Sequence, residues 1–266
     1  MLEFGKALDV GVKRRGKKNQ DAIKIVGKRT KMPLLIVADG MGGFRGGREA
    51  SQIVIRTLVR AYKKNKRKNN PGGMLGRAIL SAHQAIIKRS KSSESLTKMG
   101  STVACVVIDE IQEQVTVANV GDSRVYVISP ERIGLVSHDH SEVAELERKG
   151  VLNPVEAQNY IRKNVLTMSL AAHRPPQTVK PFIVQVPFPP GTLVLLCSDG
   201  LWGVVPDHLI RLTALEYPPQ KAAQKLVEFA NTSGGPDNIS ILIARRRGEW
   251  KTFQKQHSTE MDDTQK

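Results

Sequence analysis

The chain has 266 residues, of which 40% are hydrophobic and 5% aromatic, and its formal net charge is +16. A chain of this length can bury a substantial core in one large domain or two small ones. No window approaches the roughly 18 apolar residues of a membrane-spanning helix, and no apolar run follows the charges near the N-terminus. We therefore expect a soluble cytoplasmic protein.

The positive charge is concentrated in three clusters, at residues 13–18, 60–68 and 245–247. Such clusters suit nucleic acid, an anionic membrane surface, or acidic and phosphorylated proteins, and any such docking should be sensitive to salt. No helix-turn-helix, aromatic stacking platform or zinc-finger pattern accompanies them. We therefore interpret the clusters as solvated helix ends and loops, and we expect no specific nucleic-acid binding.

The first half of the chain contains strand patterns around two long helical patterns. Residues 21–27 and 33–39 are apolar runs that end at turns and predict strands. Apolar residues three to four positions apart predict amphipathic helices over 48–68 and 74–93. Three further strands are expected in quick succession, and their short connections predict antiparallel pairing. These strands occupy residues 101–110, 114–122 and 124–129.

In the second half we expect two short helices, a buried strand, two longer helices and a final strand. They occupy, in order, residues 141–150, 153–160, 192–200, 207–215, 219–230 and 238–247. Paired helices and strands in runs predict antiparallel sheets covered by helices, an α+β arrangement. Because no repeat or linker interrupts the pattern, we expect one domain over residues 1–247, followed by a polar, disordered tail at 248–266.

Four aspartates stand beside glycine or asparagine at the ends of predicted strands. Asp39 and Asp199 each end an apolar run, whereas Asp21 and Asp237 each open a strand. Any one of them alone would be a turn or cap residue. Together they can converge on one rim of a sheet, where their like charges repel unless a cation lies among them. Oxygen donors without Cys or His spacing favour Mg²⁺ or Mn²⁺, and paired ions of this kind suit hydrolysis of a phosphate ester.

The two cysteines, Cys105 and Cys197, both lie inside apolar strand patterns. Two buried thiols give no disulfide framework and fit a reducing compartment. A catalytic thiol needs an electropositive and partly exposed setting, so we interpret both as core residues.

A series of short motifs follows a definite order along the chain. They are NQD (19–21), VADGMGG (37–43), GST (100–102), ANVGDSRVY (118–126), HDHS (138–141), KNVLTMSL (163–170), CSDGLW (197–202) and GGPDNIS (234–240). A lone DGMGG would be a weak signal, but the full set in register is very specific. In order and spacing it resembles the bacterial branch of the metal-dependent type 2C Ser/Thr protein phosphatases, from about residue 10 to residue 245.

The resemblance implies a four-layer α/β/β/α sandwich, in which two central antiparallel sheets are flanked by helices and a two-metal centre lies at one end. It implies catalytic roles for Asp39, Asp199 and Asp237. Asp39 would bridge both ions, and the Gly40 carbonyl with Asp21 would serve one of them. Asp199 with Asp237 would hold the other ion. Gly40 would let the backbone approach a cation closely, because it has no side chain.

The resemblance also assigns more peripheral residues. Asp122 is similar to the aspartate that binds a third, weaker ion, although capping a hairpin turn is an equally good local interpretation. Asn238 would order Asp237 or a water on the metal. Residues 141–165 match the flap near the active site. The family's phosphate-binding arginine is replaced here by Gly16, and among the neighbouring basic residues we expect Arg15 to bind the substrate phosphate.

Other positions depart from the pattern or fit it only in part. Gln20 stands where many members have glutamate, so direct metal ligation from there is doubtful. Met41 replaces the histidine of eukaryotic members, a proposed general acid, as is common in bacterial ones. His138 and His140 are interpreted as structural, because no other metal-type ligand flanks them.

The resulting hypothesis is a monomeric protein phosphatase. It would hydrolyse phosphoserine and phosphothreonine, in proteins phosphorylated by Ser/Thr kinases, by attack of a water that bridges two Mg or Mn ions. One alternative is a pseudophosphatase that binds acidic partners through its basic face, and Gly16 and Gln20 are its support. The other is a metal-dependent nuclease, suggested by the charge but lacking any groove-reading motif.

Overall fold

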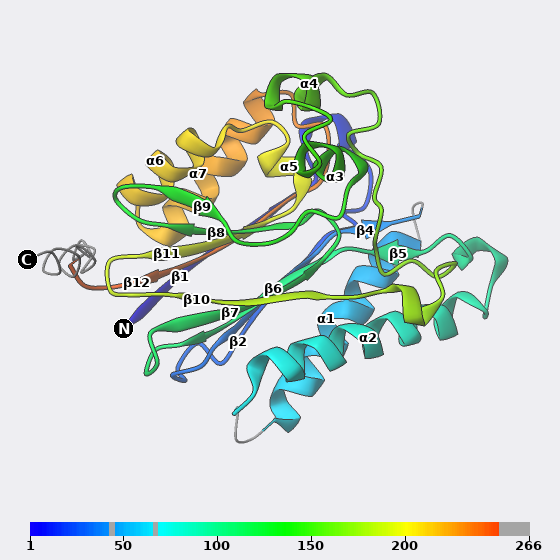
Figure 1. Cartoon of the computed structure of the whole chain (residues 1–266), viewed down its shortest axis with the longest axis horizontal. Helices are drawn as coiled ribbons and strands as arrows, with labels where there is room; N and C mark the ends of the chain where they lie inside the picture. The colour runs from blue at the N-terminus through cyan, green and yellow to red at the C-terminus, as the bar shows by residue number, and fades with distance from the viewer. Residues whose placement is uncertain (43–45, 66–68, 250–266) are drawn as a thin grey trace, which may run out of the picture.

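Two five-stranded antiparallel sheets form the centre of the fold (Figure 1). The structure is a computed structural model, and it describes residues 1–42, 46–65 and 69–249. The first sheet contains, in spatial order, β1 (Leu2–Asp9), β12 (Ile239–Arg246), β11 (Leu193–Cys197), β8 (Arg124–Ile128) and β9 (Ile133–Leu135). The second contains β10 (Phe182–Pro187), β7 (Gln114–Val120), β6 (Val103–Asp109), β3 (Leu34–Ala38) and β2 (Ala22–Val26). A short pair, β4 (Gly40–Met41) and β5 (Gly100–Ser101), stands apart from both sheets.

The side chains on the two faces of each sheet contribute to different parts of the hydrophobic core, one between the sheets and one beneath the helices. All five residues of β3 are buried, since this strand is covered on both faces. Leu35 and Val37 point into the layer between the sheets, where Leu196 and Leu242 come from the opposite sheet. Leu34 and other residues of the opposite parity face the helices instead. Because side chains alternate with a period of two, one apolar run supplies both cores.

Helices cover the outer face of each sheet. The second sheet packs against α1 (Gly46–Lys64) and α2 (Pro71–Ser90). The first sheet packs against α5 (Asp199–Trp202), α6 (Asp207–Glu216) and α7 (Pro219–Thr232). Figure 1 shows these helices on opposite sides of the paired sheets. The predicted four-layer α+β sandwich is therefore confirmed. No helix in the described ranges is long and apolar enough to cross a membrane.

Two short helices lie in the predicted flap, α3 (Glu142–Arg148) and α4 (Pro154–Asn159). The Ser141 hydroxyl accepts a bond from the Ala144 N–H at the start of α3. Asn153 and Glu156 form a reciprocal capping box at the start of α4. These caps satisfy backbone groups that a short helix otherwise leaves unpaired. The described part of the chain also contains three single-turn 3₁₀ helices, η1 (Val12–Arg14), η2 (Glu94–Leu96) and η3 (Pro176–Thr178).

Apart from the two-residue β4, three strands were not predicted from the sequence: β1, β9 and β10. Each lies at an edge of its sheet. Exposed and partly buried residues alternate along β10, and most of β1 is only partly buried, so neither strand has a strong apolar run. Both are defined by pairing, β1 with β12 and β10 with β7. The predicted helix end at 66–68 and most of the predicted tail, 250–266, lie outside the described residues.

Candidate active site

The four aspartates singled out above meet at one end of the sandwich. Asp39 follows β3 and Asp21 precedes β2, and these two strands pair antiparallel, so both residues lie at the same edge. Asp199 follows β11 and Asp237 precedes β12, which pair in the same way in the other sheet. Burial raises the pKa of Asp39, and the carboxyl groups of Asp21 and Asp199 lie close enough for their charges to raise it further. Residues that are far apart in the sequence therefore form one acidic centre.

Asp21 is held rigidly, but only by one of its oxygens. Its Oδ2 accepts hydrogen bonds from the hydroxyls of Ser198, at 2.8 Å, and Ser240, at 2.6 Å. Its Oδ1 is buried and accepts no bond from any donor in the described part of the chain. Burial raises the pKa of Asp21 to about 6, although the two hydroxyls oppose this shift. An oriented carboxylate oxygen without a partner fits a cation ligand.

The pKa values of Asp39 and Asp199 are also raised, which indicates that a nearby positive charge would stabilise both carboxylates. Burial, and then the charges of Asp21 and Asp199, raise the pKa of Asp39 well above its ordinary value. Burial, and then the charges of Asp122 and Asp237, raise that of Asp199. The Oδ1 atom of Asp199 is also buried without a donor among the described residues. Like charges gathered in a buried site are stabilised when a divalent cation lies between them.

The donor set fits hard divalent cations. Carboxylates and backbone carbonyls are the ligands that Mg²⁺ and Mn²⁺ prefer. Within the described ranges, no three His, Cys, Asp or Glu side chains already stand together in a ready coordination geometry. Asp21 and Asp199, which flank strands of different sheets, instead each interact with Asp39.

The backbone of Asp39 is fixed by the GST motif. The Thr102 N–H donates to the Asp39 carbonyl at 2.8 Å, and the Ser101 hydroxyl donates to the same oxygen at 2.9 Å. The Asp39 N–H in turn donates to the Thr102 hydroxyl at 3.2 Å. Sequence reasoning assigned no role to these hydroxyls or to those of Ser198 and Ser240. The signal available was that all four residues lie inside the short motifs quoted above.

Gly40 is required by close packing of the backbone. A Cβ atom there would lie 2.1 Å from the Gly47 carbonyl oxygen and 2.6 Å from that of Gln20. At Gly47, a Cβ would lie 2.2 Å from the Gln20 side-chain oxygen. The Ser51 hydroxyl also donates to the Gln20 carbonyl at 2.6 Å. Gln20 therefore joins the turn at Gly40 to the start of α1, which gives it a structural role.

The structure brings Arg14 to the acidic centre. Its guanidinium forms an ion pair with the Asp237 carboxylate, with an N–O distance of 2.7 Å, and about a third of the Arg14 side chain is exposed. Arg15, the residue expected from the sequence to bind phosphate, is exposed and shows no such contact. The η1 turn begins after Gly11, whose φ of 76° favours glycine, and this turn decides which arginine faces the site.

Asn238 orders Asp237 through its backbone. The Asn238 N–H donates to Asp237 Oδ1 at 2.6 Å. Its side chain bonds elsewhere: Oδ1 accepts from the Gln20 N–H at 2.9 Å, and Nδ2 donates to the Val10 carbonyl at 3.0 Å. The side chain thus ties the start of β12 to the loop that carries Arg14 and Asp21.

Asp122 lies beside this centre and is buried. Burial, and then the charge of Asp139, raise the pKa of Asp122 to about 7. The indole N–H of Trp202 donates to the Asp122 carbonyl at 3.0 Å. Arg124 stacks on the Trp202 ring and forms an ion pair with Asp139 at 2.8 Å. These contacts fix the turn that carries Asp122.

The histidines and cysteines occupy packing positions, in agreement with the sequence interpretation. Burial lowers the pKa of both His138 and His140. His140 Nδ1 lies 3.2 Å from the Gly121 carbonyl, and the His138 ring stacks on Phe182. Cys105 and Cys197 are fully buried, and burial raises the pKa values of their thiols. Neither thiol can act as a nucleophile in this setting.

The raised carboxyl pKa values predict how the stability of the metal-free protein depends on pH. The folded-state pKa values of Asp21, about 6, and Asp122, about 7, lie above the ordinary value of 3.8. The folded state therefore binds more protons than the unfolded state, and its stability falls as the pH rises through these values. In chelator we expect a Tm several degrees higher near about pH 5.5 than near about pH 8.

Thermal denaturation in chelator across this range measures the effect. Mn²⁺ added at the higher pH should restore the Tm, and Asp21→Asn should flatten the metal-free dependence. A metal-free Tm that rises with pH over the same range would contradict the electrostatic description of the centre.

Comparison with known proteins agrees with this geometry. The family model described as Protein phosphatase 2C matches residues 11–237. The serine/threonine phosphatase stp of Listeria innocua is 34% identical over 232 residues, which cover 86% of this chain and 90% of that protein. The solved serine/threonine phosphatase of S. agalactiae is 28% identical, with a TM-score of 0.85, and the match covers 93% of this chain and 100% of that one.

The solved catalytic domain of the phosphatase PstP, in complex with 2 manganese ions, has a TM-score of 0.79 and 27% identity. That match covers 92% of this chain and 97% of the solved one. The fold, the acidic centre and these matches agree with one another. The chain belongs to the protein phosphatase 2C family and is a serine/threonine protein phosphatase of the bacterial type.

Proposed function

We propose that this enzyme hydrolyses phosphoserine and phosphothreonine in proteins at the acidic centre around Asp39, with two Mg²⁺ or Mn²⁺ ions. The residues that would hold them are Asp21, Asp39, the Gly40 carbonyl, Asp199 and Asp237, with Asp122 beside a third ion. The observation that carries the proposal is the convergence of Asp21 and Asp199 on Asp39, with two buried carboxylate oxygens left without donors.

Two such cations would supply a water activated between them and would neutralise charge on the phosphoryl oxygens. The side chains of this protein position those components. Asp39 joins the two halves of the centre, while the hydroxyls of Ser198 and Ser240 fix the orientation of Asp21. The hydrogen bonds from Thr102 and Ser101 keep the backbone of Asp39 in place, so that its carboxylate needs little reorganisation when substrate binds.

We propose that Arg14, in place of Arg15, binds the phosphoryl group of the substrate. Its guanidinium is already oriented by Asp237 and remains partly exposed at the edge of the centre. Its planar fork of donors can bind two phosphate oxygens at once, which a lysine cannot do. The pseudophosphatase alternative was supported by Gly16 and Gln20. Since Arg14 can take the role of the arginine that Gly16 replaces, and Gln20 has a structural role, neither residue argues against catalysis.

Phosphate release from a phosphothreonine peptide tests the proposal. We expect turnover with Mn²⁺ or Mg²⁺ and none in chelator, with activity restored when excess metal is added back. A phosphoserine peptide should also be hydrolysed, whereas a matched phosphotyrosine peptide reports how far the site discriminates. Undiminished turnover in chelator would show that the acidic centre does not act through metal ions.

A further inference from the structure

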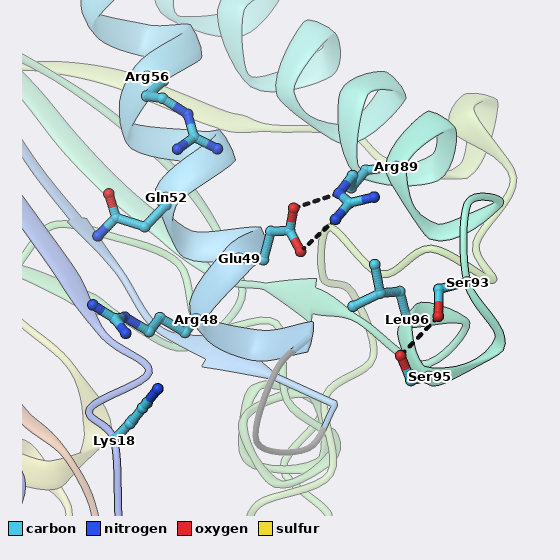
Figure 2. Close-up of a pocket in the computed structure, with 9 residues that line it drawn as sticks. All are labelled: Lys18, Arg48, Glu49, Gln52, Arg56, Arg89, Ser93, Ser95 and Leu96. Carbon is cyan, nitrogen blue, oxygen red and sulfur yellow. Dashed lines mark hydrogen bonds and ion pairs between the residues drawn. The ribbon is translucent and has the colours of Figure 1, made fainter.

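An open cleft with a volume of about 570 Å³ lies along the first half of α1 (Figure 2). Its lining residues come from the loop before Asp21, from α1, from the end of α2 and from the turn that follows it. They are Lys18, Arg48, Glu49, Gln52, Arg56, Arg89, Ser93, Ser95 and Leu96. The lining is therefore polar and predominantly basic.

Three of its cations form no ion pair with the residues that the structure describes. Arg48 and Arg56 are eight positions apart on α1, which places them, with Gln52 between them, along the same side of the helix. Figure 2 shows these side chains on one side of α1, with Lys18 below Arg48. None of the side chains of Lys18, Arg48 and Arg56 has a hydrogen bond or ion pair to another residue that the structure describes.

The opposite side of the cleft differs in charge balance. Arg89 of α2 forms an ion pair with Glu49 of α1, which neutralises both and ties the two helices together. The hydroxyls of Ser93 and Ser95 bond to each other at 2.9 Å and complete this side. One side of the cleft is therefore neutral and contains hydroxyl groups, and the other side presents the cationic side chains of Lys18, Arg48 and Arg56.

Two segments that line the cleft, the loop before Asp21 and the start of α1, also reach the acidic centre. Lys18 precedes Asp21 in the same loop, and Gly47 at the start of α1 packs directly against Gly40. At a rise of 1.5 Å per residue, Arg56 stands about 14 Å along the helix from Gly47. An extended peptide covers that length in roughly four residues. A peptide with its phosphoresidue at the acidic centre could therefore place nearby side chains among these cations.

We propose that this cleft binds acidic or phosphorylated side chains located roughly two to four residues from the phosphoresidue that is hydrolysed. The inference rests on the proposed function, since it adds a selectivity site to the same centre. An acidic peptide segment fits better than nucleic acid, because none of the described residues that line the cleft has an aromatic side chain to stack on bases. Arginines are also well suited to bind both carboxylate and phosphate groups.

The test compares three phosphothreonine peptides. The first has neutral flanks, the second has aspartates two to four positions away on either side, and the third has a second phosphothreonine at such a position. The wild-type enzyme should show a higher kcat/KM for the acidic and doubly phosphorylated peptides. In Arg48→Gln/Arg56→Gln, the ratio of kcat/KM for acidic over neutral peptide should fall about three- to tenfold, as expected for two partly solvated ion pairs.

Arg77→Gln/Lys221→Gln is the matched control, because it removes two exposed cations that do not line the cleft. It should leave the ratio of the wild-type enzyme unchanged. Equal losses in both double variants would show an effect of overall charge, and a wild-type enzyme with no preference would overturn the proposal.

Binding in chelator separates this inference from the proposed function. Fluorescence anisotropy with the same labelled peptides should show weaker binding of the acidic peptide by the Arg48/Arg56 double variant, whether or not turnover is observed. Absence of turnover on every peptide with metal would refute the proposed function alone. A single-stranded oligonucleotide that binds more tightly than the acidic peptide, and depends on the same two arginines, would reassign the cleft to nucleic acid.

Discussion

Asp39→Asn is expected to lower metal-dependent phosphate release by about a thousandfold or more, which is the largest effect of any single substitution considered. The Asp39 carboxyl group lies near both Asp21 and Asp199, whose charges add to burial in raising its pKa, so that it joins the two halves of the acidic centre. The amide removes its negative charge and one of its two acceptor oxygens, although its shape is nearly the same. Initial rates on a phosphothreonine peptide with saturating Mn²⁺ measure the loss.

The backbone bonds of Asp39 to Thr102 and Ser101 do not involve its side chain, so the variant should fold normally. Asp109→Asn is a suitable control, because Asp109 is the last residue of β6, far in the sequence from the four aspartates of the acidic centre. Its Oδ1, which accepts from the N–H groups of Ile111 and Gln112 in the following turn, is kept in the amide. That control should retain wild-type activity. More than a tenth of the wild-type rate in Asp39→Asn would show that this residue does not join two ions.

Arg14→Gln is expected to lower kcat/KM by about ten- to a hundredfold, with a substantial part of the loss in KM. Charge-assisted hydrogen bonds to a phosphate are worth about 1.5–3 kcal/mol, which corresponds to this range. Arg14→Lys should recover part of the loss, since it restores the charge without the bidentate fork. Steady-state kinetics with a single phosphopeptide measure all three enzymes.

Arg15→Gln is the matched comparison, because it removes the same charge from the neighbouring exposed position. We expect its kcat/KM to stay within about threefold of the wild type. A larger loss from Arg15→Gln than from Arg14→Gln would restore the assignment that the sequence alone suggested and would refute the role of Arg14.

The elements that the sequence predicted correctly are those with a strong internal pattern. β3 and β11 are buried on both faces, so each is a continuous apolar run. The end of the second run was predicted too late, because residues 199 and 200 of the predicted strand lie in α5. β1 and β10 lie at sheet edges, and their conformation depends on the neighbouring strand more than on their own side chains. Pairing across more than two hundred residues, as between β1 and β12, leaves no local signal.

The acidic centre was only partly predictable, for a similar reason. The positions of Asp39 and Asp199 at strand ends were visible, and antiparallel pairing then brings the other aspartates to the same rim. Spacing cannot show which way a side chain points within a single turn. The η1 turn turns Arg14 toward Asp237. The hydroxyls of Ser198 and Ser240 likewise reach Asp21 only once the two sheets are packed together.

Titration of the metal-free enzyme with Mn²⁺ by isothermal calorimetry, beside Asp39→Asn, tests the central claim most directly. The wild-type chain should bind at least two ions, and the variant should lose one or both of these sites while remaining folded. A wild-type chain that binds no Mn²⁺, or a variant that binds as many ions with the same affinity, would contradict a metal centre built around Asp39.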